Sequence, residues 1–160
     1  MEGSVGFLEI GYDPEIYCPE GEFKSVKDIV FFGNNYVNQF PLSGYRRQMV
    51  AFLKEKFWDN FGVYGNGWEN GDGNFNHSQI EEAAAYRSAK IAINLSHYDI
   101  ERYSSDRIFR ILGTGAPLCL ARYYKGIEQD FEHGKHVIYW HEFADLEAKI
   151  IRYRDWETSI

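Results

Sequence analysis

The sequence is poor in several features that define particular classes of protein. Its two cysteines, Cys18 and Cys119, are too few for a disulfide framework, and without histidine or carboxylate ligands they are too few for a zinc site. It contains no apolar run of about 18 residues, so no membrane-spanning helix is expected. Residues 1–10 lack the basic region and apolar stretch of a secretory signal. We therefore expect a cytoplasmic protein with reduced thiols.

Basic charge is also scarce. The chain has 17 Lys and Arg against 24 Asp and Glu, which gives a net charge of −7 at pH 7. Binding nucleic acid through the overall electrostatic field needs a basic face. An anionic membrane surface would also repel an acidic chain. We therefore expect neither nucleic acid nor a membrane surface as a partner.

The residues that are present suit one folded domain. The 160 residues include 44% hydrophobic and 26% charged side chains, a globular composition and not a disordered one. Aromatic residues reach 18%, enough to fill a core and to leave rings for stacking on a ligand. Residues 1–27 are punctuated by turn residues and are expected to form a linker, whereas residues 28–160 are expected to form the domain.

Strand-like and helix-like segments alternate through that domain. We expect strands at 28–33, 61–65, 90–95, 117–121 and 136–140, because each is a short apolar run next to turn residues. Between them, helices are expected to start at Ser43, Ser78 and Ser104–Asp106, with a last helix over 144–154 and one or two helical turns within 126–131. This alternation predicts an α/β fold with a Rossmann-like, three-layer parallel sheet.

Ligands of such sheets bind beyond the carboxyl ends of the strands, where the strand order reverses. The loops expected there contain Gly33-Asn34 and Gly65-Asn66, and a helix starts there at Ser104-Ser105-Asp106-Arg107. Glycine lets backbone approach a ligand closely, and a helix N-terminus with two hydroxyls and a guanidinium suits a phosphate. A plain turn and a capped helix with a surface arginine are the alternatives, and both stay open.

Other candidate sites are weaker. Arg46, near the next helix start, can reach a diphosphate or can lie on a solvated helix face. His133 and His136, with acidic neighbours, can be metal ligands, although a polar turn is favoured. The sequence has no dinucleotide-binding, P-loop or serine-nucleophile pattern. A phosphorylated signalling domain is disfavoured because Asp28 starts a strand instead of ending one. No metal and no cofactor are therefore expected.

Several segments, taken in order, resemble one family. They are 90–95, 107–118, 126–128, 134–140 and 145–147, preceded by 11–19, 28–34 and 63–68. The set resembles the carboxy-terminal, donor-binding half of group 1 glycosyltransferases, particularly the spore-maturation-protein-like branch. The resemblance implies one half of a GT-B fold, in which a nucleoside-diphosphate sugar lies between two Rossmann-like halves without a metal ion. The amino-terminal, acceptor-binding half is then missing, and the surface that it would cover is expected to favour self-association.

The resemblance also implies roles for individual residues. Gly33 and Asn34 would approach the diphosphate or the sugar, and Arg46 and Arg107 would act as catalytic cations. The remaining substrate-binding residues would border the base, the ribose and the diphosphate: Tyr64, Gly65, His77, Ser104, Ser105 and Arg110. The donor sugar would pass to the hydroxyl of an acceptor that the sequence does not identify.

Two positions depart from the family pattern. Arg102 and Arg110 stand where many members have glutamates, and an arginine cannot accept a hydrogen bond from a ribose hydroxyl. Glu101 is adjacent to the first position and can substitute after a one-residue shift. The alternative function is a non-catalytic α/β module that binds a ligand or another protein, and the chain alone is expected to be inactive in sugar transfer.

Overall fold

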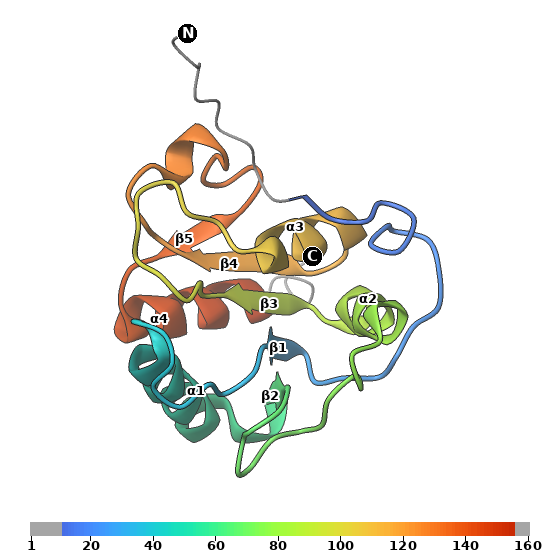
Figure 1. Cartoon of the computed structure of the whole chain (residues 1–160), viewed down its shortest axis with the longest axis horizontal. Helices are drawn as coiled ribbons and strands as arrows, with labels where there is room; N and C mark the ends of the chain where they lie inside the picture. Colours follow the sequence, from blue (N-terminus) through green and yellow to red (C-terminus); the bar gives the residue numbers. More distant parts are fainter. Residues whose placement is uncertain (1–10, 156–160) are drawn as a thin grey trace, which may run out of the picture.

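The computed structural model describes residues 11–155, so the first ten residues of the expected linker and residues 156–160 lie outside it. Five parallel strands form one sheet in the order β2-β1-β3-β4-β5 (Figure 1). They are β1 Ile29–Phe32, β2 Phe61–Tyr64, β3 Ile91–Asn94, β4 Leu118–Arg122 and β5 Ile138–Trp140. The predicted α/β fold with a parallel sheet is confirmed.

Helices cover both faces of the sheet, as the strand–helix alternation predicts. They are α1 Ser43–Phe57, α2 Gln79–Ser88, α3 Asp106–Thr114 and α4 Phe143–Arg154, with short 3₁₀ turns η1 Trp58–Asn60 and η2 Ile127–Gln129. Helices α1 and α4 lie together on one face, and α2 and α3 lie on the other (Figure 1). The result is the three-layer arrangement of a Rossmann-like domain.

The N-termini of α1 and α2 differ in the hydrogen bonds that their serine hydroxyls accept from backbone N–H groups. Ser78 caps α2, as expected, because its hydroxyl accepts a hydrogen bond from the Glu81 N–H at 3.3 Å. Ser43 does not cap α1. It is the first helical residue, and its hydroxyl accepts from the N–H of Phe40 at 3.1 Å, three residues earlier. The Ser43 hydroxyl oxygen is therefore used by the turn before α1 and does not cap the helix.

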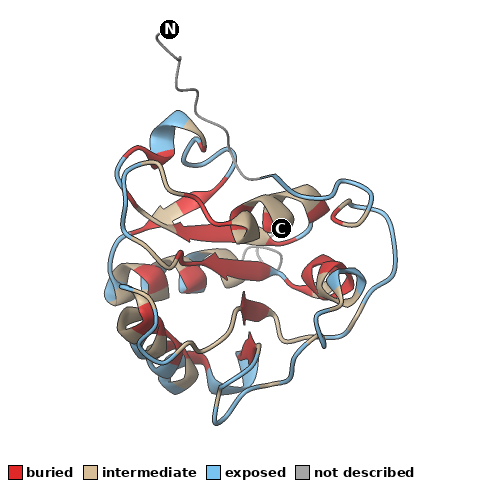
Figure 2. Cartoon of the chain, in the orientation of Figure 1, coloured by how far each residue is buried: buried red, intermediate tan, exposed pale blue. Residues whose placement is uncertain are grey.

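Two apolar layers hold the sheet between the helices. Alternate residues of β1 serve both: Ile29 and Phe31 pack with α1 and α4, whereas Val30 and Phe32 pack with α2 and α3. Figure 2 shows β1, β2 and β3 buried along their length, whereas β4 and β5 include intermediate residues and the loops are largely exposed or intermediate. A strand covered on both faces needs a continuous apolar run, which explains why these segments are visible in the sequence.

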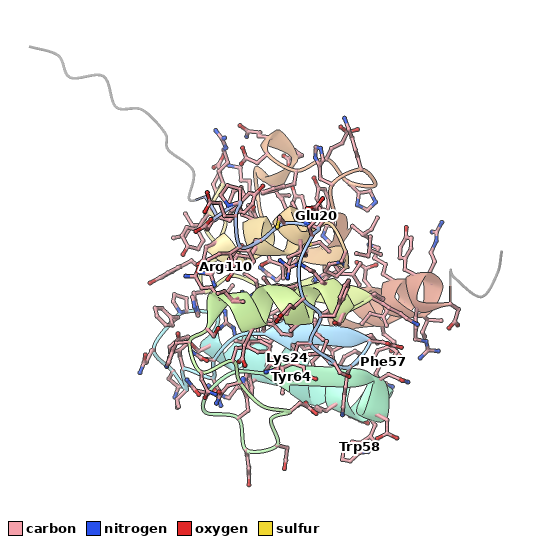
Figure 3. The ribbon with its side chains drawn as sticks, turned by 90° about the vertical axis from the view of Figure 1, so that its right-hand side faces the viewer. Glu20, Lys24, Phe57, Trp58, Tyr64 and Arg110 are labelled. Atoms are coloured by element: carbon pink, nitrogen blue, oxygen red, sulfur yellow. The ribbon has the colours of Figure 1, made fainter. Side chains whose placement is uncertain are left out.

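The described part of the linker, residues 11–27, is packed on the domain and not detached from it. Arg87 of α2 donates hydrogen bonds to the carbonyls of Ile16, Cys18 and Glu22 at 2.7, 2.8 and 3.0 Å. Tyr17 is 1% exposed and belongs to the apolar layer between the sheet and α2 and α3. In Figure 3, Glu20 and Lys24 mark the linker as it crosses this face. Within residues 11–155, no helix has the length and apolar character needed to cross a membrane.

The strand order places a reversal in the middle of the sheet. The chain runs from β1 outward to β2, and then returns to the other side of β1 to form β3. Connections from β1 and β3 therefore leave in opposite directions, and a crevice is expected where they part, at the carboxyl ends. Gly33 follows β1 there, and Leu95 follows β3.

Candidate functional site

A cavity of about 380 Å³ lies at this reversal. The loops after β1 and β2, the turn before α2, and the first turns of α2 and α3 line it. Seven of the predicted site residues are in its lining: Gly33, Asn34, Tyr64, Gly65, His77, Arg107 and Arg110. Three others, Arg46, Ser104 and Ser105, are not part of it.

Arg107 is fixed at the reversal by the two strand ends. Its Nε donates to the carbonyl of Phe32 at 2.6 Å, and its Nη1 donates to the carbonyl of Leu95 at 2.9 Å. In residues 11–155, Nη2 has no hydrogen-bond partner and the guanidinium has no carboxylate partner. A cation with one free edge is thus held rigidly at the cavity wall.

The absence of a side chain at Gly33 leaves room for Nη2 of Arg107. A β-carbon at this position would lie 2.9 Å from Nη2 of Arg107 and 3.0 Å from the ring of Phe31. A side chain would therefore displace the guanidinium or the ring. The close neighbours of Gly33 in the structure are the Arg107 guanidinium and the Phe31 ring, and its approach to a ligand stays a prediction.

The buried guanidinium of Arg46 adds a second positive charge next to that of Arg107. It is 1% exposed, and it donates to the carbonyls of Asn34 at 3.2 Å and Leu95 at 3.1 Å. Its Nε is buried without a partner among the described residues. Burial, together with the charge of Arg107, lowers the pKa of Arg46 to about 9. Arg46 does not line the cavity, so it would act on a ligand there only through its charge.

The loops after β1 and β2 are joined by polar contacts. Trp68 Nε1 donates to the carbonyl of Gly33 at 2.7 Å, and the Asn66 N–H donates to Oδ1 of Asn34 at 2.8 Å. Gly65 has a φ of +152°, and a β-carbon there would lie 2.4 Å from the Gly33 carbonyl oxygen. Only glycine fits this position, which explains the glycine at the end of β2.

Aromatic rings line the cavity beside these loops. The rings of Tyr64 and Phe75 stack at 5.7 Å between centroids, and Phe32 meets both edge-on. The Tyr64 hydroxyl accepts a hydrogen bond from the Lys27 N–H at 3.1 Å, and burial raises the pKa of Tyr64. The ring, and not its hydroxyl, is the part of Tyr64 that remains for a ligand. His77 lies in the turn before α2, with a φ of +61°.

Ser104 and Ser105 turn inward and not toward the cavity. Ser104 shares a short hydrogen bond with the hydroxyl of Tyr124, and the Ser105 hydroxyl donates to Oδ1 of Asn94 at 3.5 Å. Both serines are buried. Of the predicted Ser-Ser-Asp-Arg cluster, the structure therefore brings Asp106 and Arg107 to the cavity and keeps the two hydroxyls in the interior.

The lining also includes a carboxylate that the sequence analysis missed. Oε2 of Glu82 on α2 accepts from the Tyr17 hydroxyl at 3.0 Å and from Nη1 of Arg110 at 3.1 Å. Arg110 also pairs with Asp106 at 2.8 Å. Burial raises the pKa of Glu82, although Arg110 opposes the shift. In the sequence, Glu81 and Glu82 are both acidic residues at the start of a helix. Only the orientation of that helix in the structure shows that Glu82 faces the cavity and Glu81 does not.

The other charged residues of interest lie away from the cavity. Arg102 pairs with Asp130 at 2.7 Å, and Glu101 pairs with Lys125 at 2.8 Å. Glu101 therefore does not take the place of a cavity carboxylate in this structure.

The histidine pair belongs to a polar turn. Nδ1 of His133 accepts from the Tyr139 N–H, and Nδ1 of His136 accepts from the Glu132 N–H, both at 3.0 Å. Across residues 11–155, no three His, Cys, Asp or Glu side chains gather closely enough to hold a metal ion.

A comparison with family models assigns the chain to a family. A model described as glycosyl transferase-like matches residues 46–159, which is more than two thirds of the sequence. A comparison with curated proteins finds no match. The matched residues include every helix and all but the first strand of the Rossmann-like sheet, apart from the first three residues of α1. The chain therefore belongs to the glycosyl transferase-like family.

Proposed function

We propose that the cavity binds a nucleoside-diphosphate sugar, with the diphosphate at Arg107, and that the protein transfers the sugar to an acceptor hydroxyl. One observation carries the proposal: the Arg107 guanidinium, which has no carboxylate partner in the part of the chain that the structure describes, faces the cavity of a protein whose net charge is −7. A second buried guanidinium, Arg46, stands behind it. An anionic ligand supplies the negative charge that this pair lacks.

The chemistry of transfer suits this arrangement. When the bond between the sugar and the diphosphate breaks, negative charge grows on the departing diphosphate, and a fixed cation stabilises that charge. The N-terminus of α3, where Arg107 lies, adds its dipole. The anchoring of Arg107 by two carbonyls keeps the cation in place during the reaction, so little reorganisation is needed. Should the reaction retain configuration, the leaving diphosphate can itself assist the incoming hydroxyl.

The acceptor is proposed to come from the open side of the cavity. Val37 and Ile100, on the loops after β1 and β3, are 61% and 55% exposed. Exposed apolar side chains on loops at the carboxyl edge of the sheet, the edge where the cavity lies, support an additional surface that covers them. We assign that surface to an acceptor-binding domain, in keeping with one half of a GT-B enzyme of the spore-maturation-protein-like branch.

Calorimetric titration tests donor binding. UDP, GDP and their sugars are titrated into the wild-type protein, into Arg107→Ala and into Arg152→Ala, a control that removes an exposed arginine of α4. We expect at least one nucleotide to bind the wild type and the control equally. Arg107→Ala should bind it about tenfold to hundredfold more weakly, because a hydrogen bond to a charged group is lost. Absence of binding by every nucleotide at millimolar concentration contradicts the proposal.

A second measurement separates transfer from binding alone. Slow hydrolysis of the bound donor, or sugar transfer when an acceptor-binding half is added, is expected from an enzyme. Arg110 in place of a carboxylate on α3 favours the alternative, a non-catalytic binding module. Tight donor binding without any hydrolysis or transfer supports that alternative.

A further inference from the structure

One nitrogen of the His97 ring is buried and has no hydrogen-bond partner. Nδ1 is closed off from solvent, and no residue in the described part of the chain donates to it or accepts from it. The residue as a whole is half-buried and lines the cavity together with Arg107. Nε2 is not among the buried nitrogens of residues 11–155 that lack a partner, and it has no partner there either. Nε2 is therefore the nitrogen that a ligand can reach.

Packing holds the His97 ring in one orientation. The ring lies on Phe40 at 4.2 Å between centroids and meets Tyr36 edge-on at 5.2 Å. The His97 carbonyl accepts a hydrogen bond from the Leu42 N–H at 3.0 Å, which joins the loop after β3 to the residue before α1 (Figure 1). A side chain held in this way loses little conformational entropy when it binds a ligand.

The charges around the ring favour its neutral form. The titratable groups that face it are Arg46 on α1, Arg107 and Asp106 on α3, and Tyr36 of the loop after β1. Burial, followed by the two arginine charges and against Asp106, lowers the pKa of His97 to about 4. The neutral ring carries one proton. On Nδ1 this proton would be a buried donor without an acceptor, whereas a lone pair there is attracted by both arginines. The proton therefore belongs on Nε2.

On the proposed function, we infer that His97 donates a hydrogen bond from Nε2, as an uncharged imidazole, to an oxygen of the diphosphate that Arg107 binds. Arg46 and Arg107 already repel each other, so a third cation would add to that repulsion. A neutral N–H gives an anionic oxygen a hydrogen bond without adding charge. His97 then contacts the substrate, and Phe40 and Tyr36 are positioning residues that hold its ring.

Pyrophosphate is the probe, because it carries the oxygens of a diphosphate and has no base or sugar. Its affinity is measured by calorimetry from pH 6.5 to 8.5 for the wild type, His97→Phe, His97→Gln and the control His141→Phe. The Phe variant keeps a ring against Phe40 and has no donor, whereas the Gln variant keeps an amide N–H near the position of Nε2. His141 is exposed and does not line the cavity.

His97→Phe should bind pyrophosphate about tenfold more weakly than the wild type and His141→Phe do, and His97→Gln should recover much of the loss. The affinity ratio of wild type to His97→Phe cancels the titration of pyrophosphate itself. This ratio should stay constant across the pH range, because a neutral imidazole does not change its charge there. Nitrogen NMR of the wild type, which needs no variant, should show a protonated Nε2 and an unprotonated Nδ1 at pH 7.5, with and without pyrophosphate.

A ratio that falls toward one as the pH rises overturns the inference, because it identifies His97 as a cation, and so does an NMR spectrum in which both ring nitrogens are protonated. Equal pyrophosphate affinity in the wild type and His97→Phe overturns it as well. In each of these cases the proposed function stands as long as nucleotide binding depends on Arg107. If the wild type binds neither pyrophosphate nor any nucleoside diphosphate, the inference and the proposed function fail together.

Discussion

Arg46 and Arg107 donate hydrogen bonds to the same acceptor, the carbonyl oxygen of Leu95, at 3.1 and 2.9 Å. Both guanidinium groups also lie over the ring of Phe31, at 5.3 and 5.0 Å from its centroid. With the carbonyls of Asn34 and Phe32, which each accept from one of the two, these uncharged partners offset only part of the repulsion between two neighbouring cations. The site therefore holds positive charge at an energetic cost, and a bound anion relieves that cost.

Replacement of Arg46, the buried arginine of this pair, should lower the stability of the fold and should reduce ligand affinity less than replacement of Arg107 does. Arg46→Ala leaves a cavity and removes the donors to the carbonyls of Asn34 and Leu95. We expect the free energy of unfolding in urea to fall by about 2–4 kcal/mol. The affinity for pyrophosphate should fall less than it does in Arg107→Ala. An equal loss of affinity in both variants, with unchanged stability of Arg46→Ala, would place Arg46 in direct contact with the ligand.

Addition of one methyl group should disturb the site. In Gly33→Ala the new β-carbon would lie 2.9 Å from Nη2 of Arg107, so the guanidinium must move from its place. Nucleotide affinity is expected to fall about tenfold, with a smaller effect on thermal unfolding than that of Gly65→Ala. Gly65→Ala combines a φ of +152° with a contact of 2.4 Å to backbone, and is expected to destabilise the fold itself. Unchanged affinity in Gly33→Ala contradicts the placement of the diphosphate.

Asp72 joins three segments of the chain: α1, the linker and β2. Its carboxylate binds Lys54 of α1, Lys27 of the linker at 3.0 Å and the N–H of Val63 at 2.9 Å. Asp72→Asn should lower the free energy of unfolding by about 2 kcal/mol, because two cations lose their shared partner. The exposed Asp59→Asn, in η1, serves as the control. Equal unfolding midpoints for the wild type and Asp72→Asn would refute this role.

The same carboxylate predicts a dependence on pH. Burial alone would raise the pKa of Asp72, but the hydrogen bonds from Lys54 and Val63 lower it below its ordinary value of 3.8. A lowered pKa stabilises the fold above that value, and the contribution is lost as the pH falls through the pKa of the folded state. The stability difference between the wild type and Asp72→Asn should therefore shrink below pH 3.8. A difference that is constant down to pH 2 contradicts this assignment.

The lowered pKa of His97 predicts a loss of stability at a less acidic pH than that of Asp72 does. Its ring packs on Phe40 at 4.2 Å between centroids. Burial, followed by the charges of Arg46 and Arg107, lowers the pKa of His97 from 6.5 to about 4, and Asp106 opposes the shift. The unfolded chain binds a proton at this residue before the folded protein does, so stability should fall as the pH decreases from 6.5 to about 4.

A comparison of thermal unfolding in wild type and His97→Phe isolates that effect. The variant keeps a ring on Phe40 and has no group to protonate, so it should gain stability relative to the wild type as the pH falls through this window. His141→Phe, at an exposed histidine, is the control. Parallel pH profiles for the wild type and His97→Phe would show that protonation of His97 does not oppose folding.

The fold could be predicted largely because the sheet is buried on both faces. The run Ile29–Phe32 is apolar at every position and Ile91–Asn94 is apolar except at its last residue, and glycine and polar turns separate these strands from the helices. The proximity of Gly33 and Arg107 also follows from topology, since parallel strands end at one edge of the sheet. The functional roles of the residues around the cavity stay predictions.

Other parts of the site depend on side-chain directions, which local patterns do not encode. The capping pattern at Ser78 explains both Glu81 and Glu82 as helix-start charges, although only Glu82 faces the cavity. Ser104 and Ser105 turn inward because Tyr124 and Asn94, distant in sequence, accept or share their hydrogen bonds. Arg46 was expected on a solvated face or at a diphosphate, and its burial rests on two carbonyls supplied by other loops.

The three hydrogen bonds from Arg87 to the linker have a consequence for how the cavity can vary within this family. They fix the backbone on both sides of Tyr17, the residue that holds the Glu82 carboxylate. Tyr17 precedes the region that the family model matches. Substitutions in this linker, which lies outside the matched region, would therefore shift a carboxylate of the cavity while the sheet and its arginines remain unchanged.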